Sequence, residues 1–144
     1  VHGELYGTPR SELVAAARDG CQVVLDIDVQ GARQIRASVP DALLVFVLPP
    51  SVDSLVRRLT GRGTEAEEKV ARRLRTALDE LEVLVEFDRV VVNEDLETCL
   101  GEIREVVARD GRRPAPTGTL RNEVEEMRVE IARILQERYA NVRA

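Results

Sequence analysis

The sequence lacks the phosphate-binding loop that is typical of many enzymes that use ATP. No Gly-x-x-x-x-Gly-Lys-Ser/Thr pattern occurs in its 144 residues, and the only lysine, Lys69, follows two glutamates rather than a glycine-rich turn. Such a loop surrounds nucleotide phosphates with backbone N–H groups, and it normally follows the first strand of the fold. If this chain belongs to such an enzyme, the sequence predicts that the front end of the enzyme is missing from it.

Long apolar runs, histidine and cysteine are also scarce. The longest apolar run, Ala42–Leu48, is far shorter than the roughly 20 residues that span a bilayer. His2 has no histidine or cysteine nearby, and Cys21 and Cys99 lie far apart, unlike a metal site or a disulfide framework. No export signal is recognisable. We therefore expect a cytoplasmic location, reduced thiols, no metal held by the protein alone and no membrane partner.

Positive charge is concentrated in one stretch of an acidic chain. The formal net charge is −5, which argues against a nucleic-acid partner. Arginines nevertheless gather between residues 57 and 75, at Arg57, Arg58, Arg62, Arg72, Arg73 and Arg75. Because arginine can hold phosphate oxygens in pairs, this stretch predicts an anionic ligand bound at one place. The alternative is a solvated helix in which neighbouring glutamates pair with the arginines at i to i+4 spacing.

Short apolar runs alternate with helical patterns along the chain. Three runs are typical of buried strands: Cys21–Val29, Leu43–Leu48 and Arg89–Val92. Helices are expected at about residues 32–38, 51–59, 65–86 and 94–110. Ser51 caps the second of these helices, and a Thr64/Glu67 capping box opens the third. This alternation predicts an α/β fold with a parallel sheet.

A linker with prolines and glycine, residues 111–119, separates a domain at 1–110 from a terminal helix at 120–144. The helix carries an apolar stripe with heptad-like spacing: Leu120, Val124, Met127, Ile131 and Ile134. About three heptads are enough either to dock on the same domain or to pair with another chain. Docking is the favoured interpretation, and self-association through residues 120–139 is the alternative.

Asp26 and Asp28 end the first expected strand. Residues two apart on a strand point to the same face, and this end of an open α/β sheet is where ligands bind. A carboxylate there can accept hydrogen bonds from a ligand or order the water shell of a metal ion. The alternative is that one aspartate caps the helix that follows Gly31.

Tyr6 and Thr8 flank a glycine near the start of the sequence. Hydroxyl groups on a short loop can bind a phosphate and the edge of a base without adding charge. Taken alone, this pattern more often indicates an ordinary turn before a helix that starts at about Ser11.

Together, these stretches closely resemble the guanylate kinase family, from Val1 to about Arg109. The motifs are Val-His-Gly-x-Leu-Tyr-Gly-Thr, Leu-Asp-Ile-Asp-Val-Gln-Gly-Ala, Leu-Pro-Pro-Ser, Arg-Leu-x-Gly-Arg-Gly-Thr and Val-Val-Asn-Glu-Asp-Leu, in the family's order and spacing. The resemblance implies a sheet of the nucleoside monophosphate kinase type. It also implies Mg²⁺-dependent phosphoryl transfer from ATP to GMP, with GMP and ATP as the partners.

The resemblance implies roles for residues on both nucleotides. On the GMP side, Tyr6 would contact the phosphate, Thr8 the guanine, and Asp28 the same site. On the ATP side, Asp26 would lie near the Mg²⁺-bound phosphates, and Asn93 would border the adenine.

The segment at about residues 58–75 would be the lid that closes over the phosphates. Within it, the resemblance makes Arg58, Arg62 and Arg73 the catalytic lid arginines. Glu4 is a local departure, because the family commonly has asparagine there, and it adds negative charge beside a nucleotide site.

The larger departure is the absent phosphate loop. In the family, the strand before that loop lies between the strands predicted here at Cys21–Val29 and Leu43–Leu48. We therefore expect a truncated chain that lacks its first strand and is inactive alone. The alternative, a non-catalytic guanylate-kinase-like module that binds protein partners, is disfavoured by the retained arginines and the aspartate pair.

Overall fold

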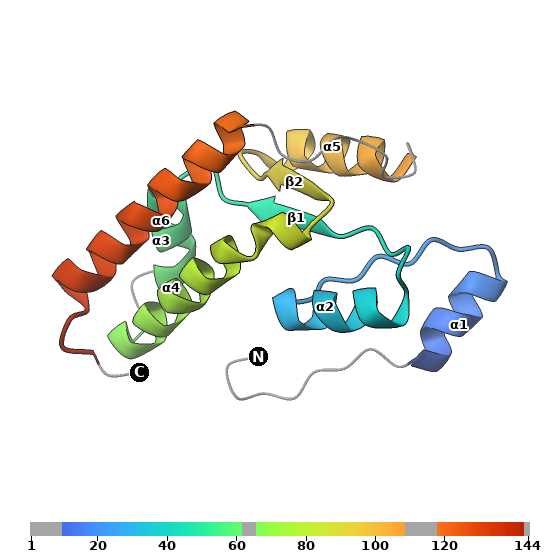
Figure 1. Cartoon of the computed structure of the whole chain (residues 1–144), viewed down its shortest axis with the longest axis horizontal. Coiled ribbons are helices and arrows are strands. Elements are labelled where there is room, and N and C mark those ends of the chain that lie inside the picture. The colour runs from blue at the N-terminus through green and yellow to red at the C-terminus, as the bar shows by residue number, and fades with distance from the viewer. Residues whose placement is uncertain (1–9, 62–65, 109–117, 143–144) are drawn as a thin grey trace. The chain divides into compact units, whose positions relative to one another are not determined.

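The computed structural model of the chain describes residues 10–61, 66–108 and 118–142. The chain divides into two compact units, Val1–Ala42 and Leu43–Ala144. The first unit contains two helices, and the second contains two strands and the remaining helices (Figure 1). Among the helices that the structure describes, none has both the length and the apolar content needed to cross a membrane.

The first unit consists of α1 (Arg10–Arg18), α2 (Val29–Ser38) and the segment between them. After α1, Gly20 adopts a positive φ of 70°, and the amide of Cys21 donates to the carbonyl oxygen of Ala16 at 2.9 Å. Glycine adopts a positive φ at little cost, so this residue reverses the chain and ends the helix.

The prediction of a strand at Cys21–Val29 is wrong. Residues 21–28 form no strand, and Val29 is already the first residue of α2. A strand is stable only when its backbone N–H and C=O groups pair with a neighbouring strand, and the described residues provide no such partner for this segment. Val24 is accordingly 82% exposed despite its apolar character. The argument that Asp26 and Asp28 share one face of a strand therefore fails.

In its described residues, the second unit contains a small parallel sheet and five helical segments. The strands β1 (Val45–Leu48) and β2 (Arg89–Val92) pair in register from Val45 opposite Arg89 to Leu48 opposite Val92. Between them lie α3 (Val52–Thr60), α4 (Glu67–Glu82) and the short 3₁₀ helix η1 (Leu84–Glu86). After β2 come α5 (Leu96–Ala108) and α6 (Gly118–Arg138). The α/β class and the parallel pairing of the strands are confirmed.

The local predictions in this unit hold with small differences. The strand at Arg89–Val92 is confirmed, whereas the strand expected at Leu43–Leu48 begins at Val45. Ser51 caps α3, since its Oγ accepts a hydrogen bond from the amide of Ser54 at 3.2 Å. Thr64 of the expected capping box lies outside the described residues, and Ala66 precedes α4 without a side-chain cap. α4 ends at Glu82 because the chain tightens into η1 before it enters β2.

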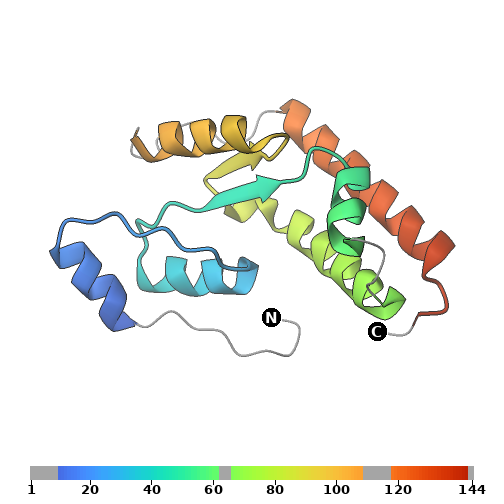
Figure 2. The same ribbon diagram turned by 180° about the vertical axis from the view of Figure 1, so that it is seen from behind.

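The main core of the second unit joins α3, α4 and α6. The largest fully buried side chains, Val52, Leu74 and Ile131, come one from each of these helices. α6 lies along α4, with α3 beside them, in both Figure 1 and Figure 2. The apolar stripe predicted on the terminal helix is therefore docked on its own unit, as the favoured interpretation expects.

Candidate functional site at the carboxyl edge of the sheet

Asn93 lies where the two parallel strands of the second unit end. Both strands run in the same direction, so Leu48 and Val92 finish at the same edge of the sheet. The amide of Asn93 donates to the carbonyl oxygen of Leu48 at 2.8 Å, which fixes Asn93 at the end of the ladder. Open α/β sheets bind ligands at this edge, so the residues here are candidates for a binding site.

Arg58 reaches the same edge from α3. Its Nη2 donates to the main-chain carbonyl oxygen of Asn93 at 2.9 Å, although the two residues are 35 positions apart in sequence. Arg58 lies in the last turn of α3, where the carbonyl groups of the helix favour a positive charge. A guanidinium has five N–H donors, and this bond uses one of them. The contact thus places a cation with further donor capacity at the carboxyl edge.

The chain turns after α3 at Gly61, which has a φ of 56° and donates its N–H to the carbonyl oxygen of Arg57 at 3.1 Å. A residue with a side chain would be strained in this conformation. Arg62 follows within residues 62–65, outside the described part of the chain. On the far side of this turn, α4 carries Arg72, which is exposed, and Arg73, which is half-buried.

Arg75 does not join the other arginines. Its Nη2 donates to the carbonyl oxygen of Val142 at 2.8 Å, beyond the end of α6. Residues two apart on a helix point about 200° away from each other, so Arg73 and Arg75 cannot both face one ligand. Arg75 is therefore not one of the arginines of residues 57–75 that could meet one anion together with Arg73.

Asp95 supplies a carboxylate just beyond this edge, as the N-cap of α5. Its Oδ1 accepts a hydrogen bond from the amide of Thr98 at 2.9 Å. Hydrogen bonds from the Thr98 side chain and backbone lower the pKa of Asp95, because they stabilise the charged form. The helix expected at about residues 94–110 therefore begins at Leu96, with Asp95 as its capping residue.

In the first unit, Asp28 is the N-cap of α2. Its Oδ1 accepts a hydrogen bond from the amide of Gly31 at 2.8 Å, and a Cβ on Gly31 would lie only 3.0 Å from the Cβ of Ile27. Glycine is thus needed for this close approach. The capping interpretation holds for Asp28, which is half-buried, while Asp26 is exposed in the segment before the helix.

The predicted site residues are described to different extents. Arg58 and Asn93 are brought together, Arg73 lies on the next helix, and Asp26 and Asp28 precede α2 in the first unit. Tyr6, Thr8 and Arg62 lie outside the described residues, and their roles stay predictions. Within residues 10–61, 66–108 and 118–142, no three His, Cys, Asp or Glu side chains are grouped as a metal site requires.

Sequence reasoning missed the contacts that these arginines make. The acceptors of Arg58 and Arg75 are main-chain carbonyl oxygens 35 and 67 residues away, at Asn93 and Val142. Every residue type has such a carbonyl group, so no sequence signal marks an acceptor at this range. Only the tertiary structure, which brings Arg58 of α3 to the end of β2 and packs α6 on α4, reveals these contacts.

Known proteins show clear similarity to this chain. The sequence profile of the guanylate kinase family matches residues 1–110. A guanylate kinase from Synechococcus sp. (strain CC9311) is 52% identical over 101 residues, which are 70% of this chain and 53% of that protein. A guanylate kinase from Leifsonia xyli subsp. xyli (strain CTCB07) is 54% identical over 111 residues, 77% of this chain and 42% of that protein. A guanylate kinase from Rhodococcus jostii (strain RHA1) is 51% identical over 105 residues, which are 72% of this chain and 51% of that protein.

The matched part of the chain spans about half the length of these curated relatives. It nevertheless forms most of this chain, and the profile match contains both strands and the helices that carry Arg58 and Arg73. The chain belongs to the guanylate kinase family.

Proposed function

We propose that this chain is part of a guanylate kinase, which transfers a phosphoryl group from ATP to GMP and gives ADP and GDP. The observation that carries the proposal is the family match over residues 1–110. The proposed setting is a sheet of the nucleoside monophosphate kinase type, to which β1 and β2 contribute, in a cytoplasmic protein. These 144 residues do not include the strand and loop that hold the ATP phosphates in that fold.

Arg58, Arg62 and Arg73 are the proposed catalytic groups. Phosphoryl transfer depends on positioning the reactants and neutralising charge, and guanidinium groups remain charged at any working pH. The bond from Arg58 to Asn93, at 2.9 Å, supports a place for this arginine at the carboxyl edge. An arginine delivered in the transition state typically contributes about 10³ to 10⁵ in rate.

Tyr6 and Thr8 are the proposed contacts to the phosphate and the guanine of GMP, and Asp28 belongs to the same site. The capping bond to Gly31 uses Oδ1 of Asp28, so Oδ2 can accept a hydrogen bond from a ligand. Asn93 is proposed to border the adenine of ATP. Its main chain is held there by Leu48 and Arg58.

Asp26 is the proposed protein group beside the Mg²⁺-bound phosphates. Mg²⁺ keeps several waters and is usually held through one or two carboxylates plus substrate phosphates. An exposed carboxylate outside any acidic cluster of the described residues fits that mode. Bound with ATP, Mg²⁺ neutralises charge on the phosphates. The role of Asp26 is to accept hydrogen bonds from the water shell of the ion and so to orient it.

The 144-residue chain by itself is expected to release no ADP in the presence of ATP, GMP and Mg²⁺, because it contains no phosphate loop. A coupled assay of ADP release tests this expectation. Mg²⁺-dependent turnover by the isolated chain that disappears in Arg62→Ala would contradict it.

A chimera tests the function itself. The rest of the Synechococcus relative, which the family pattern expects to carry the phosphate loop, would be joined to Val1. The chimera should release ADP only with both ATP and GMP. Arg62→Ala and Arg73→Ala should each lower kcat by about 100-fold or more. Arg72→Ala, at the exposed neighbouring position, is the matched control and should stay within about threefold of the parent.

The same experiment separates the alternative function. A chimera that folds, as judged by circular dichroism, but shows no turnover would contradict the kinase proposal. That result would favour a guanylate-kinase-like module that binds protein partners.

A further inference from the structure

The C-terminal helix α6 lies outside the family match, yet it is built into the second unit. The match ends at residue 110, and α6 spans Gly118–Arg138. Ile131 of α6 has no exposed surface and belongs to the same core as Val52 of α3 and Leu74 of α4. Side chains in such a core pack without room to shift, so α6 helps to set how α3 and α4 lie against each other.

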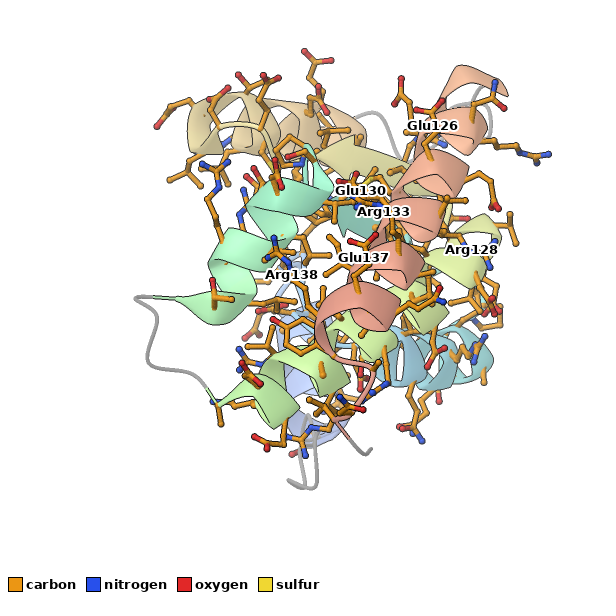
Figure 3. The ribbon with its side chains drawn as sticks, turned by 90° about the vertical axis from the view of Figure 1, so that its left-hand side faces the viewer. Glu126, Arg128, Glu130, Arg133, Glu137 and Arg138 are labelled. Carbon is orange, nitrogen blue, oxygen red and sulfur yellow. The ribbon has the colours of Figure 1, made fainter. Side chains whose placement is uncertain are left out.

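Two arginines join α6 to α4 at opposite ends of the pair. Arg75 of α4 donates to the carbonyl oxygen of Val142, just beyond α6, at 2.8 Å. Arg128 of α6 lies 2.5 Å from Glu82, the last residue of α4, and 2.8 Å from Glu125 of its own helix. Arg128 leaves α6 on the side of α4 (Figure 3). Each arginine therefore holds the C-terminal end of the opposite helix.

Neither arginine is fully satisfied by these bonds. Nη1 of Arg75 and Nε of Arg128 are buried and have no hydrogen-bond partner among the described residues. A buried donor without a partner lowers stability, so these two contacts hold α6 less tightly than fully bonded arginines would. Replacing either arginine with methionine also removes an unsatisfied donor and keeps an apolar stem, so both variants are expected to fold.

The helices that α6 joins carry the proposed phosphate-binding arginines. Arg58 lies in the last turn of α3, Arg73 lies in α4, and the turn at Gly61 follows α3. α6 contacts both α3 and α4. α3 and α4 also contact each other directly, and α6, which is not part of the family match, adds a second connection between these two arginine-bearing helices.

We propose that α6 is a strap that joins α3 and α4 into one three-helix body and limits how far these helices can separate. With the strap docked, α3 and α4 move together. With the strap loosened, the direct contact between α3 and α4 remains, but α4 moves more freely relative to α3. The consequence for phosphate binding rests on the proposed function, whereas the coupling of the three helices does not.

Hydrogen–deuterium exchange of the 144-residue chain tests the coupling. Arg75→Met and Arg128→Met each remove one hydrogen bond between the α4 and α6 segments, and Arg128→Met also removes the bond to Glu125 within α6. The loss of the bond between the helices should speed amide exchange about three- to tenfold in α4 and α6. Exchange in α3 should rise with them, although no hydrogen bond from either arginine to α3 occurs in the described structure. Exchange in β2 and α5 should stay unchanged.

Two matched controls each remove a guanidinium that makes no bond between α6 and α4 in the described structure. Arg72→Met changes the exposed arginine one turn before Arg75, and Arg133→Met removes a pair with Glu137 that lies within α6. Neither should alter exchange in α3. Arg75→Lys, which keeps a charged donor, should restore part of the protection that Arg75→Met loses.

Two results would contradict the proposal that α6 couples α3 to α4. One is faster exchange confined to the substituted helix, and the other is an equal rise across α3, β2 and α5, which indicates global destabilisation. The exchange result is independent of the chimera. An inactive chimera would refute the kinase proposal and leave the coupling standing, whereas an active chimera with α3 exchange unchanged in both methionine variants would refute the strap alone.

Discussion

Replacing Ile131 with alanine measures how much the docked terminal helix contributes to the stability of the second unit. Ile131 has no exposed surface and sits in the core with Val52 and Leu74. The substitution removes three buried carbon atoms, at about 0.8 kcal/mol each, which gives a transfer cost of about 2.4 kcal/mol. The cavity left behind adds to this cost, and such substitutions typically destabilise by about 2–5 kcal/mol in total. We expect the free energy of unfolding to fall by that amount.

Urea unfolding followed by far-UV circular dichroism provides the measurement, with the slope m compared between variants to confirm that the extent of unfolding is unchanged. Val129→Ala is the matched control, because Val129 lies on the same helix and is 63% exposed. The control should change the free energy of unfolding by less than about 0.5 kcal/mol. Ile131→Val should lie between the two, at about 0.5–1.5 kcal/mol.

The reasoning fails if Ile131→Ala and Val129→Ala destabilise to the same small extent. That outcome would mean that α6 is not docked in solution, and that its apolar stripe is available to a partner after all. Sedimentation of the chain with and without residues 120–144 would then show whether α6 mediates association.

Three further predictions concern the glycine positions and the helix caps. Gly101→Ala in α5 should stabilise the protein by about 0.5–1 kcal/mol, because the space around Gly101 is open. Gly20→Ala should destabilise the protein by about 1 kcal/mol, because Gly20 has a φ of 70°. If thermal unfolding shows a change of the same sign for both variants, this prediction is contradicted. Asp28→Ala should lower the free energy of unfolding by about 1 kcal/mol, because the N-cap of α2 is lost, whereas Asp28→Asn should retain the cap. Normal GMP-dependent turnover of a chimera with Asp28→Asn would show that Asp28 has a capping role only. Asp95→Ala should destabilise at pH 7. Because the folded pKa of Asp95 lies below its ordinary value of 3.8, its stabilisation is complete above that value and disappears as the pH falls through the folded pKa. Urea unfolding should therefore show a smaller difference in the free energy of unfolding between Asp95→Ala and the parent at about pH 3 than at about pH 7. An equal difference at the two pH values would refute the role of the Asp95 charge.

Local sequence patterns predicted much of the second unit. Ser51 caps α3 as its spacing indicates, Asp95 opens α5, and β2 has the predicted bounds. These features depend on residues within one helical turn or one short strand, so the information lies in the neighbouring sequence. The motifs that resemble the guanylate kinase family also indicated the family that the profile match shows.

The candidate site was only partly predictable. Arg58 and Asn93 were both named from motifs, but their contact depends on where the end of α3 lies relative to the end of β2. Arg75 was grouped with the other arginines because it is near them in sequence, yet its guanidinium binds Val142 instead. Helical periodicity allows either orientation, and only the position of α6 determines which one the side chain adopts.

The sequence alone establishes the features that are properties of neighbouring residues. These are the absent phosphate loop, the clustered arginines, the alternation of strands and helices, and the apolar stripe of the last helix. The tertiary structure decided that Cys21–Asp28 is not a strand, that the stripe of α6 is covered by α3 and α4, and that the arginines divide between the sheet edge and the terminal helix. The physical reason is the same in each case. Backbone pairing, burial and the choice of a carbonyl acceptor all require a partner from a distant part of the chain, and local sequence does not specify which partner comes within reach.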